Sequence, residues 1–176
     1  MDLHWDTLMT SWEPRSLFSE HETWAAPDHI RFGDCDIPVL KGEILLLFLS
    51  VHFAFHHMFD GLLLLCDLFL ILRRDAERID WDRLIAIANR CRCQRALFYC
   101  LHFVHALMAA PVPSEVLDRL RPPGSIRALM PTGRLLFRDT VVPKTLERCV
   151  KFLLIDARGG RWRAVKAWIE VTLKGV

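Results

Sequence analysis

The 176-residue sequence lacks several features that would assign it at once to a class of protein. Its opening, Met1-Asp2-Leu3-His4, has neither the basic nor the apolar segment of a secretory signal. No internal repeat or low-complexity tract is present. The two most apolar segments, 44–55 and 62–72, are each about half as long as a membrane-spanning helix of about 20 residues. These absences predict a cytoplasmic protein that does not cross a membrane.

The composition is that of a folded domain. Hydrophobic residues make up 52% of the chain, enough to bury a core. Six cysteines without a secretion signal indicate reduced thiols, most of them buried. The charge is uneven, because residues 1–113 carry 10 Lys and Arg against 15 Asp and Glu, whereas residues 114–176 carry 13 against 6. Basic and acidic residues alternate in this last part, so a solvated helical face is favoured over binding of nucleic acid.

Hydrophobic periodicity predicts a mainly α protein, a helical bundle with a small N-terminal β element. Alternating side chains indicate a strand at 2–5 and a hairpin whose arms, 29–32 and 37–40, flank Gly33-Asp34. We expect helices at 41–57, 61–74, 94–110 and around 162–173. Two more are expected to follow an N-cap residue, one after Asp80 and one from Ser114 to 120. A further helix is expected to begin at Pro143. The predicted division is a partial β element at 1–40 and a helical domain at 41–176.

Three histidines form the first candidate site. His52 and His56 are four residues apart and therefore share a helix face, with His57 beside them. This spacing suits metal ligands, but the glutamate of a His-Glu-x-x-His motif is absent. Asp67 on the next helix could approach the cluster. A structural hydrogen-bond network is favoured, and a metal site or a contact with a substrate or partner stays open.

Two further clusters allow both a functional and a structural interpretation. Cys91 and Cys93, with Cys100 and nearby histidines, could bind zinc, but one residue between paired cysteines is fewer than zinc sites favour, so core thiols are preferred. Arginines flank Gly159-Gly160 and could bind phosphate, but a turn between two helices is preferred.

The order of several short motifs carries a resemblance. Asp2-Leu3-His4-Trp5 precedes the helix of His52, His56 and His57, and Leu65-Cys66-Asp67-Leu68 and Ile79-Asp80-Trp81-Asp82-Arg83-Leu84 follow. Over roughly residues 1–120 this order resembles the C-terminal portion of the uncharacterised nucleotidyltransferase family, which is similar to polymerase-β-type nucleotidyltransferases. The resemblance implies a small mixed sheet with catalytic carboxylates, covered by helices.

The resemblance also implies roles for particular residues. Asp2 matches the third catalytic carboxylate and would be a Mg²⁺ ligand. His52, His56 and Asp67 match recurrent polar positions on the helices, which makes them candidate contacts for a substrate. The implied substrate is a nucleoside triphosphate, and arginines such as Arg73, Arg74 and Arg161 could contact its phosphates.

The chain departs from the family pattern in one respect. No Gly-Ser helix start and no Asp-x-Asp pair precede Asp2, and Asp34-Cys35-Asp36 follows it, which is the wrong order. We therefore expect the chain to be inactive alone, whether it is truncated, a relic, or completed by another chain. A homodimer or a partner chain could supply the missing sheet, because an exposed apolar surface would remain without it. The alternative is a non-catalytic helical interaction domain.

Overall fold

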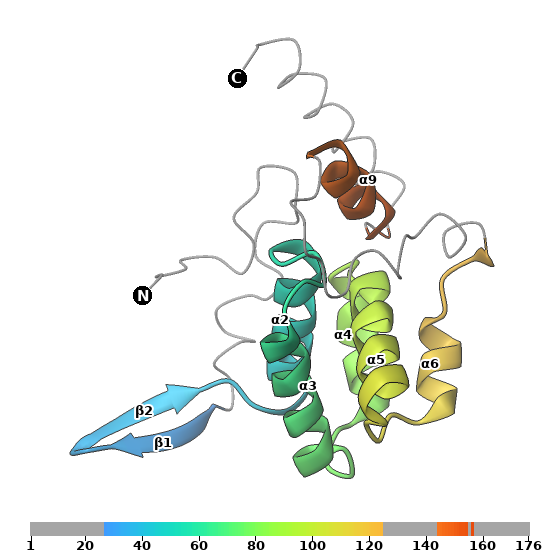
Figure 1. Cartoon of the computed structure of the whole chain (residues 1–176). Coiled ribbons are helices and arrows are strands. Elements are labelled where there is room, and N and C mark those ends of the chain that lie inside the picture. The colour runs from blue at the N-terminus through green and yellow to red at the C-terminus, as the bar shows by residue number, and fades with distance from the viewer. Residues whose placement is uncertain (1–26, 125–143, 155, 157–176) are drawn as a thin grey trace.

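Helices dominate the part of the protein that the structure describes. The computed structural model describes residues 27–124, 144–154 and 156, which form six helices and one two-stranded sheet (Figure 1). The prediction of a mainly α bundle with a small N-terminal β element is confirmed. The expected strand at 2–5, the Gly159-Gly160 turn and the final helix around 162–173 lie outside the described residues. The division at residue 40 stays a prediction.

The β element is an antiparallel hairpin of β1 (Asp28–Phe32) and β2 (Cys35–Val39). Its two-residue turn is Gly33-Asp34, and Gly33 has a φ of 62°. A positive φ at the first turn position and a negative φ at the second make a type II′ turn. This turn favours glycine at its first position and matches the twist of the strands. The hairpin extends away from the helices (Figure 1).

The helix α2 (Gly42–Phe55) lies at the centre of the bundle and packs against α3 (Leu62–Asp75), α4 (Trp81–Arg90) and α5 (Gln94–Met108). It is apolar almost all round, as a helix with neighbours on several sides must be. The core contains fully buried side chains from each of these helices: Leu46, Phe53, Leu68, Leu84, Leu97 and Leu101. No helix among the described residues is long and apolar enough to cross a membrane.

An unusual backbone joins α2 to α3. Met58 and Phe59 have φ values of 52° and 60°, a left-handed conformation that is rare for residues with large side chains. Both side chains are buried, and the Phe59 ring lies edge-on to Phe53 and Phe103, with centroids 5.6 and 5.1 Å apart. This packing holds the strained backbone in place. The expected helix to His57 therefore ends earlier, at Phe55.

The predicted cap of α4 is confirmed, because the Asp80 carboxylate accepts a hydrogen bond of 2.9 Å from the Arg83 N–H. The predicted cap of α6 (Ser114–Leu120) is wrong. Pro113 is its N-cap residue and Ser114 its first helical residue, without a side-chain cap. Pro113 has the extended backbone of an N-cap residue, with φ −60° and ψ 136°, and its ring favours this φ, so the helix begins at Ser114.

The helix α9 (Lys144–Leu154) packs on α2 from the far part of the chain. Its apolar residues Val150 and Leu154 are fully buried. Arg95, at the start of α5, donates to the Leu153 carbonyl at 2.9 Å and pairs with Asp156 at 3.1 Å. The Asp156 carboxylate also lies 3.4 Å from the Arg95 backbone N–H, so it faces the positive end of the α5 dipole.

Candidate functional site

The predicted histidine cluster exists at the C-terminal end of α2. The His52 ring stacks on the His56 ring at a centroid distance of 4.9 Å and meets the His57 ring edge-on at 4.8 Å. His57 is exposed, and His52 and His56 are half-buried. The strained turn at Met58 and Phe59 follows directly. Three imidazoles therefore gather at one accessible helix end on a rigid support.

One contact restricts the charge of this cluster. The Nε2 atoms of His52 and His57 lie 3.1 Å apart, which is hydrogen-bond distance. One nitrogen must donate and the other must accept, so the two rings cannot both be in the doubly protonated form while the bond persists. A pair of this kind can exchange a proton with a polar ligand or hold one ring in a fixed orientation.

Asp67 does not complete this cluster. It lies half-buried on α3, and within residues 27–124 no hydrogen bond or ion pair connects it to a histidine. In the described part of the chain, no group of three or more His, Cys, Asp or Glu side chains is arranged to hold a metal ion. The described residues therefore do not fit a Mg²⁺ ion, which requires several oxygen ligands. Asp2, the predicted Mg²⁺ ligand, lies outside the described residues.

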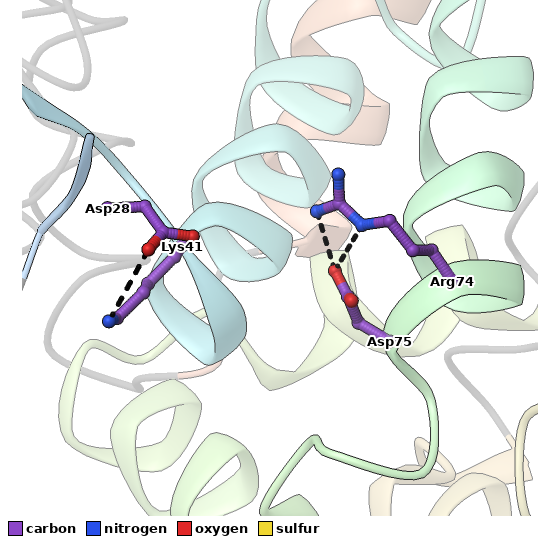
Figure 2. Close-up of polar contacts among 4 residues, drawn as sticks. All are labelled: Asp28, Lys41, Arg74 and Asp75. Atoms are coloured by element: carbon purple, nitrogen blue, oxygen red, sulfur yellow. Dashed lines mark hydrogen bonds and ion pairs between the residues drawn. The ribbon is translucent and has the colours of Figure 1, made fainter. Parts of the chain in front are cut away.

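A second candidate region lies at the C-terminal end of α3. Leu70, Ile71, Arg73 and Arg74 line an open hollow of about 380 Å³. The Arg74 guanidinium donates to the Asp75 carboxylate through Nε at 2.9 Å and Nη2 at 2.6 Å (Figure 2). This hydrogen-bonded pairing raises the pKa of Arg74 above its usual value. Arg73 is exposed and has no ion pair among the described residues, so its charge is available to an anion.

The base of the hairpin lies close to this hollow. Lys41, just before α2, pairs with Asp28 of β1 at 3.7 Å (Figure 2). Asp28 also contributes to the raised pKa of Arg74 through its negative charge. Arg161, the third predicted phosphate contact, lies outside the described residues.

The Asp-x-Asp strings have structural roles. Asp36 of the Asp34-Cys35-Asp36 string pairs with His29 across the hairpin at 2.8 Å. A second string is Asp80-Trp81-Asp82. Its first residue, Asp80, caps α4, and its last residue, Asp82, pairs with Arg119. Asp36, Asp80 and Asp82 each contact a protein group, and among the described residues neither string is part of a group arranged to hold a metal ion.

The cysteines of the possible zinc cluster are separate core thiols. Cys91, Cys93 and Cys100 are buried and unbridged. The Cys93 thiol donates to the Ala88 carbonyl at 3.7 Å, and the Cys100 thiol to the Ser50 carbonyl at 3.2 Å. Burial raises the pKa of both thiols, which keeps them protonated and unreactive at neutral pH.

Comparison with known proteins decides the family. A family model described as an uncharacterised nucleotidyltransferase matches residues 1–109. The chain belongs to this family. The match covers the Asp2 string, the hairpin and the helices from α2 to α5. No curated protein and no solved structure matches the chain.

Sequence reasoning missed one central residue of this nucleotidyltransferase-family region. Glu43, near the start of α2, is only 9% exposed. Its carboxylate accepts a hydrogen bond of 2.8 Å from the Asp80 N–H and lies 3.6 Å from the Arg83 guanidinium. The partners are 37 positions apart, and no local pattern marks such a pair. The contact fixes the start of α2 against the start of α4.

Proposed function

We propose that this chain is the helical, substrate-binding part of a nucleotidyltransferase-like protein and that it binds a Mg²⁺-nucleoside triphosphate. The family match over residues 1–109 carries the proposal. Members of such a family would transfer a nucleoside monophosphate from the triphosphate to an acceptor hydroxyl, with release of pyrophosphate. Negative charge develops on the phosphate oxygens during this transfer, and cations must neutralise it.

The described residues offer groups suited to binding. Arg73 in the hollow of α3 presents an exposed guanidinium, the side chain that best matches phosphate oxygens. The rings of His52 and His56 stack at the end of α2 and are the proposed contacts for the base, the sugar or an acceptor. Asp2 supplies one carboxylate by the resemblance. One carboxylate is too few for a Mg²⁺ site, so the proposed activity needs further carboxylates from another segment or chain.

Calorimetric titration of the chain with Mg²⁺-ATP and Mg²⁺-CTP tests the proposal. We expect binding in the range of micromolar to millimolar dissociation constants, weakened at least about tenfold by Asp2→Ala, which corresponds to about 1.4 kcal/mol. Asp34→Ala is the matched control, because Asp34 lies in the exposed hairpin turn, and this variant should bind like the wild type.

Activity provides the second arm of this experiment. We expect no pyrophosphate release from the chain and Mg²⁺-ATP alone. Absence of heat with both nucleotides would reject the nucleotide site and leave the alternative, a non-catalytic helical interaction domain. Pyrophosphate release by the chain alone would contradict the proposal that its site is incomplete.

A further inference from the structure

The hairpin of β1 and β2 has an apolar face that is open to solvent. Directly opposed residues of an antiparallel pair share a face, so the pairs Ile30↔Ile37 and Phe32↔Cys35 place four apolar side chains together. Ile30, Phe32 and Ile37 are 51%, 76% and 39% exposed. The opposite face carries His29, Arg31, Asp36 and Pro38. A lone two-stranded hairpin is marginally stable in water, so this element is expected to gain a further strand.

The register shows which strand edge can accept one. The turn has two residues, and the pair that closes such a turn, Phe32↔Cys35, exchanges hydrogen bonds. Hydrogen-bonded and non-hydrogen-bonded pairs alternate, so Arg31↔Asp36 and His29↔Pro38 are the non-hydrogen-bonded ones. This assignment agrees with the chemistry of Pro38, which has no N–H to give to β1. The backbone groups of these residues therefore point outward, away from the hairpin.

The two outer edges differ as a result. On β1, the N–H and C=O groups of His29 and Arg31 all point outward and are available. On β2, Pro38 removes one of the outward donors, and proline at an edge obstructs the addition of a strand. The hairpin thus has one open edge, β1, and one protected edge, β2.

We propose that a second copy of this chain adds its β1 to the β1 edge, so that two hairpins form one four-stranded antiparallel sheet. The strand order is β2-β1-β1-β2, with a twofold axis at Ile30. This register opposes Ile30 to Ile30 of the other copy and pairs the outward groups of His29 with those of Arg31. On one face it forms a row of four isoleucines, Ile37 and Ile30 of each copy.

The charges on the other face are compatible with this register. Arg31 of one copy lies opposite His29 of the other, and each arginine has Asp36 as its cross-strand neighbour. Asp36 also lies 2.8 Å from His29, so the carboxylate of each hairpin has two basic side chains as neighbours on this face. No row places two carboxylates or two arginines opposite each other.

Pro38 on the other edge explains why the proposed assembly ends at two copies. After dimerisation both outer edges are β2 edges, each protected by Pro38, so the interface is self-complementary and closed. Two five-residue strands bury less surface than a standard interface of about 1,600 Å². The dimer is accordingly weak, with a dissociation constant on the order of 10 μM or above. The proposal does not depend on nucleotide binding.

Sedimentation velocity of the full chain over a range of concentrations tests the assembly. We expect a monomer that converts to a dimer, and to nothing larger, with rising concentration. Arg31→Pro removes an outward N–H of β1 and should leave a monomer. Asp36→Pro makes the same change at the opposed position of the protected β2 edge and should still dimerise. A wild-type chain that stays monomeric near 200 μM, or that forms open-ended oligomers, would overturn the proposal.

Cross-linking tests the register even if a proline variant disturbs the hairpin. In a Cys35→Ser, Cys149→Ser background, Ile30→Cys should give a disulfide-linked dimer under mild oxidation, because opposed Cα atoms of a non-hydrogen-bonded pair lie within disulfide range. Ile37→Cys, in the outer row of the same face, should give none. Equal cross-linking of both variants, or of Ile37→Cys alone, would overturn the register.

Discussion

At the scale of single residues, the environment of a side chain changes its chemistry more than its position in a motif does. His102 on α5 illustrates this. Its ring stacks on Phe98 at a centroid distance of 5.5 Å. His102 is exposed overall, but desolvation of its ring by neighbouring side chains, and then the nearby charges of His105 and Arg121, lower the pKa of His102 below its usual value. No sequence pattern distinguishes His102 from the histidines of α2, because these causes depend on tertiary neighbours.

His102 makes the fold sensitive to acid. The unfolded chain protonates this histidine near pH 6.5, whereas the folded protein does so only at lower pH. The unfolded state therefore binds more protons in between, and stability falls as the pH falls through this range. We expect His102→Gln to lose less stability than the wild type between about pH 8 and about pH 5, measured by urea unfolding. An identical loss in both proteins would contradict this expectation.

At the scale of elements, helix existence is far easier to predict than helix ends. Repeating apolar positions predicted α2, α3 and α5 within about two residues, and Asp80 predicted the start of α4. The turn after α2 was not predictable, because Met58 and Phe59 adopt a backbone that sequence patterns assign to glycine or asparagine. Their burial against Phe53 and Phe103 imposes it, and burial is a property of the assembled fold.

The junction of α2 and α4 depends on Glu43. We expect Glu43→Ala to lower the free energy of unfolding by about 2–3 kcal/mol, because it leaves the Asp80 N–H without its acceptor and removes the carboxylate that pairs with the Arg83 guanidinium. Glu43→Gln retains an acceptor and should cost about 1 kcal/mol. Urea unfolding measures both, with Glu77→Ala, an exposed carboxylate, as the control. Equal losses in Glu43→Ala and Glu77→Ala would show that the junction does not depend on this contact.

At the scale of the whole molecule, distant segments meet through polar contacts that no local pattern encodes. The family match ends at residue 109, yet α9 packs on α2 and is tied to α5 through Arg95. Arg95 and Asp156 are 61 positions apart. The sequence predicted a helix after Pro143 but not its place in the bundle. Of the candidate site, the histidine cluster was predictable from helical spacing, whereas the separation of Asp67 from it required the structure.

The Arg95–Asp156 pair should control the attachment of α9. Both side chains are largely buried, at 11% and 15% exposed. Arg95→Met removes the guanidinium that binds the Leu153 carbonyl and the Asp156 carboxylate, and we expect a loss of about 2–4 kcal/mol and faster proteolytic cleavage after residue 120. Arg78→Met, at an exposed arginine, is the control and should leave cleavage unchanged. Unchanged cleavage in Arg95→Met would mean that apolar packing alone holds α9.

The central position of α2 has a consequence for synthesis of the protein. Its main neighbour, α5, begins about 40 residues later in the chain. At about 5–20 residues per second, the apolar surface of α2 stays without that neighbour for roughly 2–8 s after it is made. During this interval the most apolar segment of the nascent chain is exposed to the chaperones and other proteins near the ribosome. Chaperone capture should therefore concentrate on residues 44–72, and it should end when Phe103 has emerged.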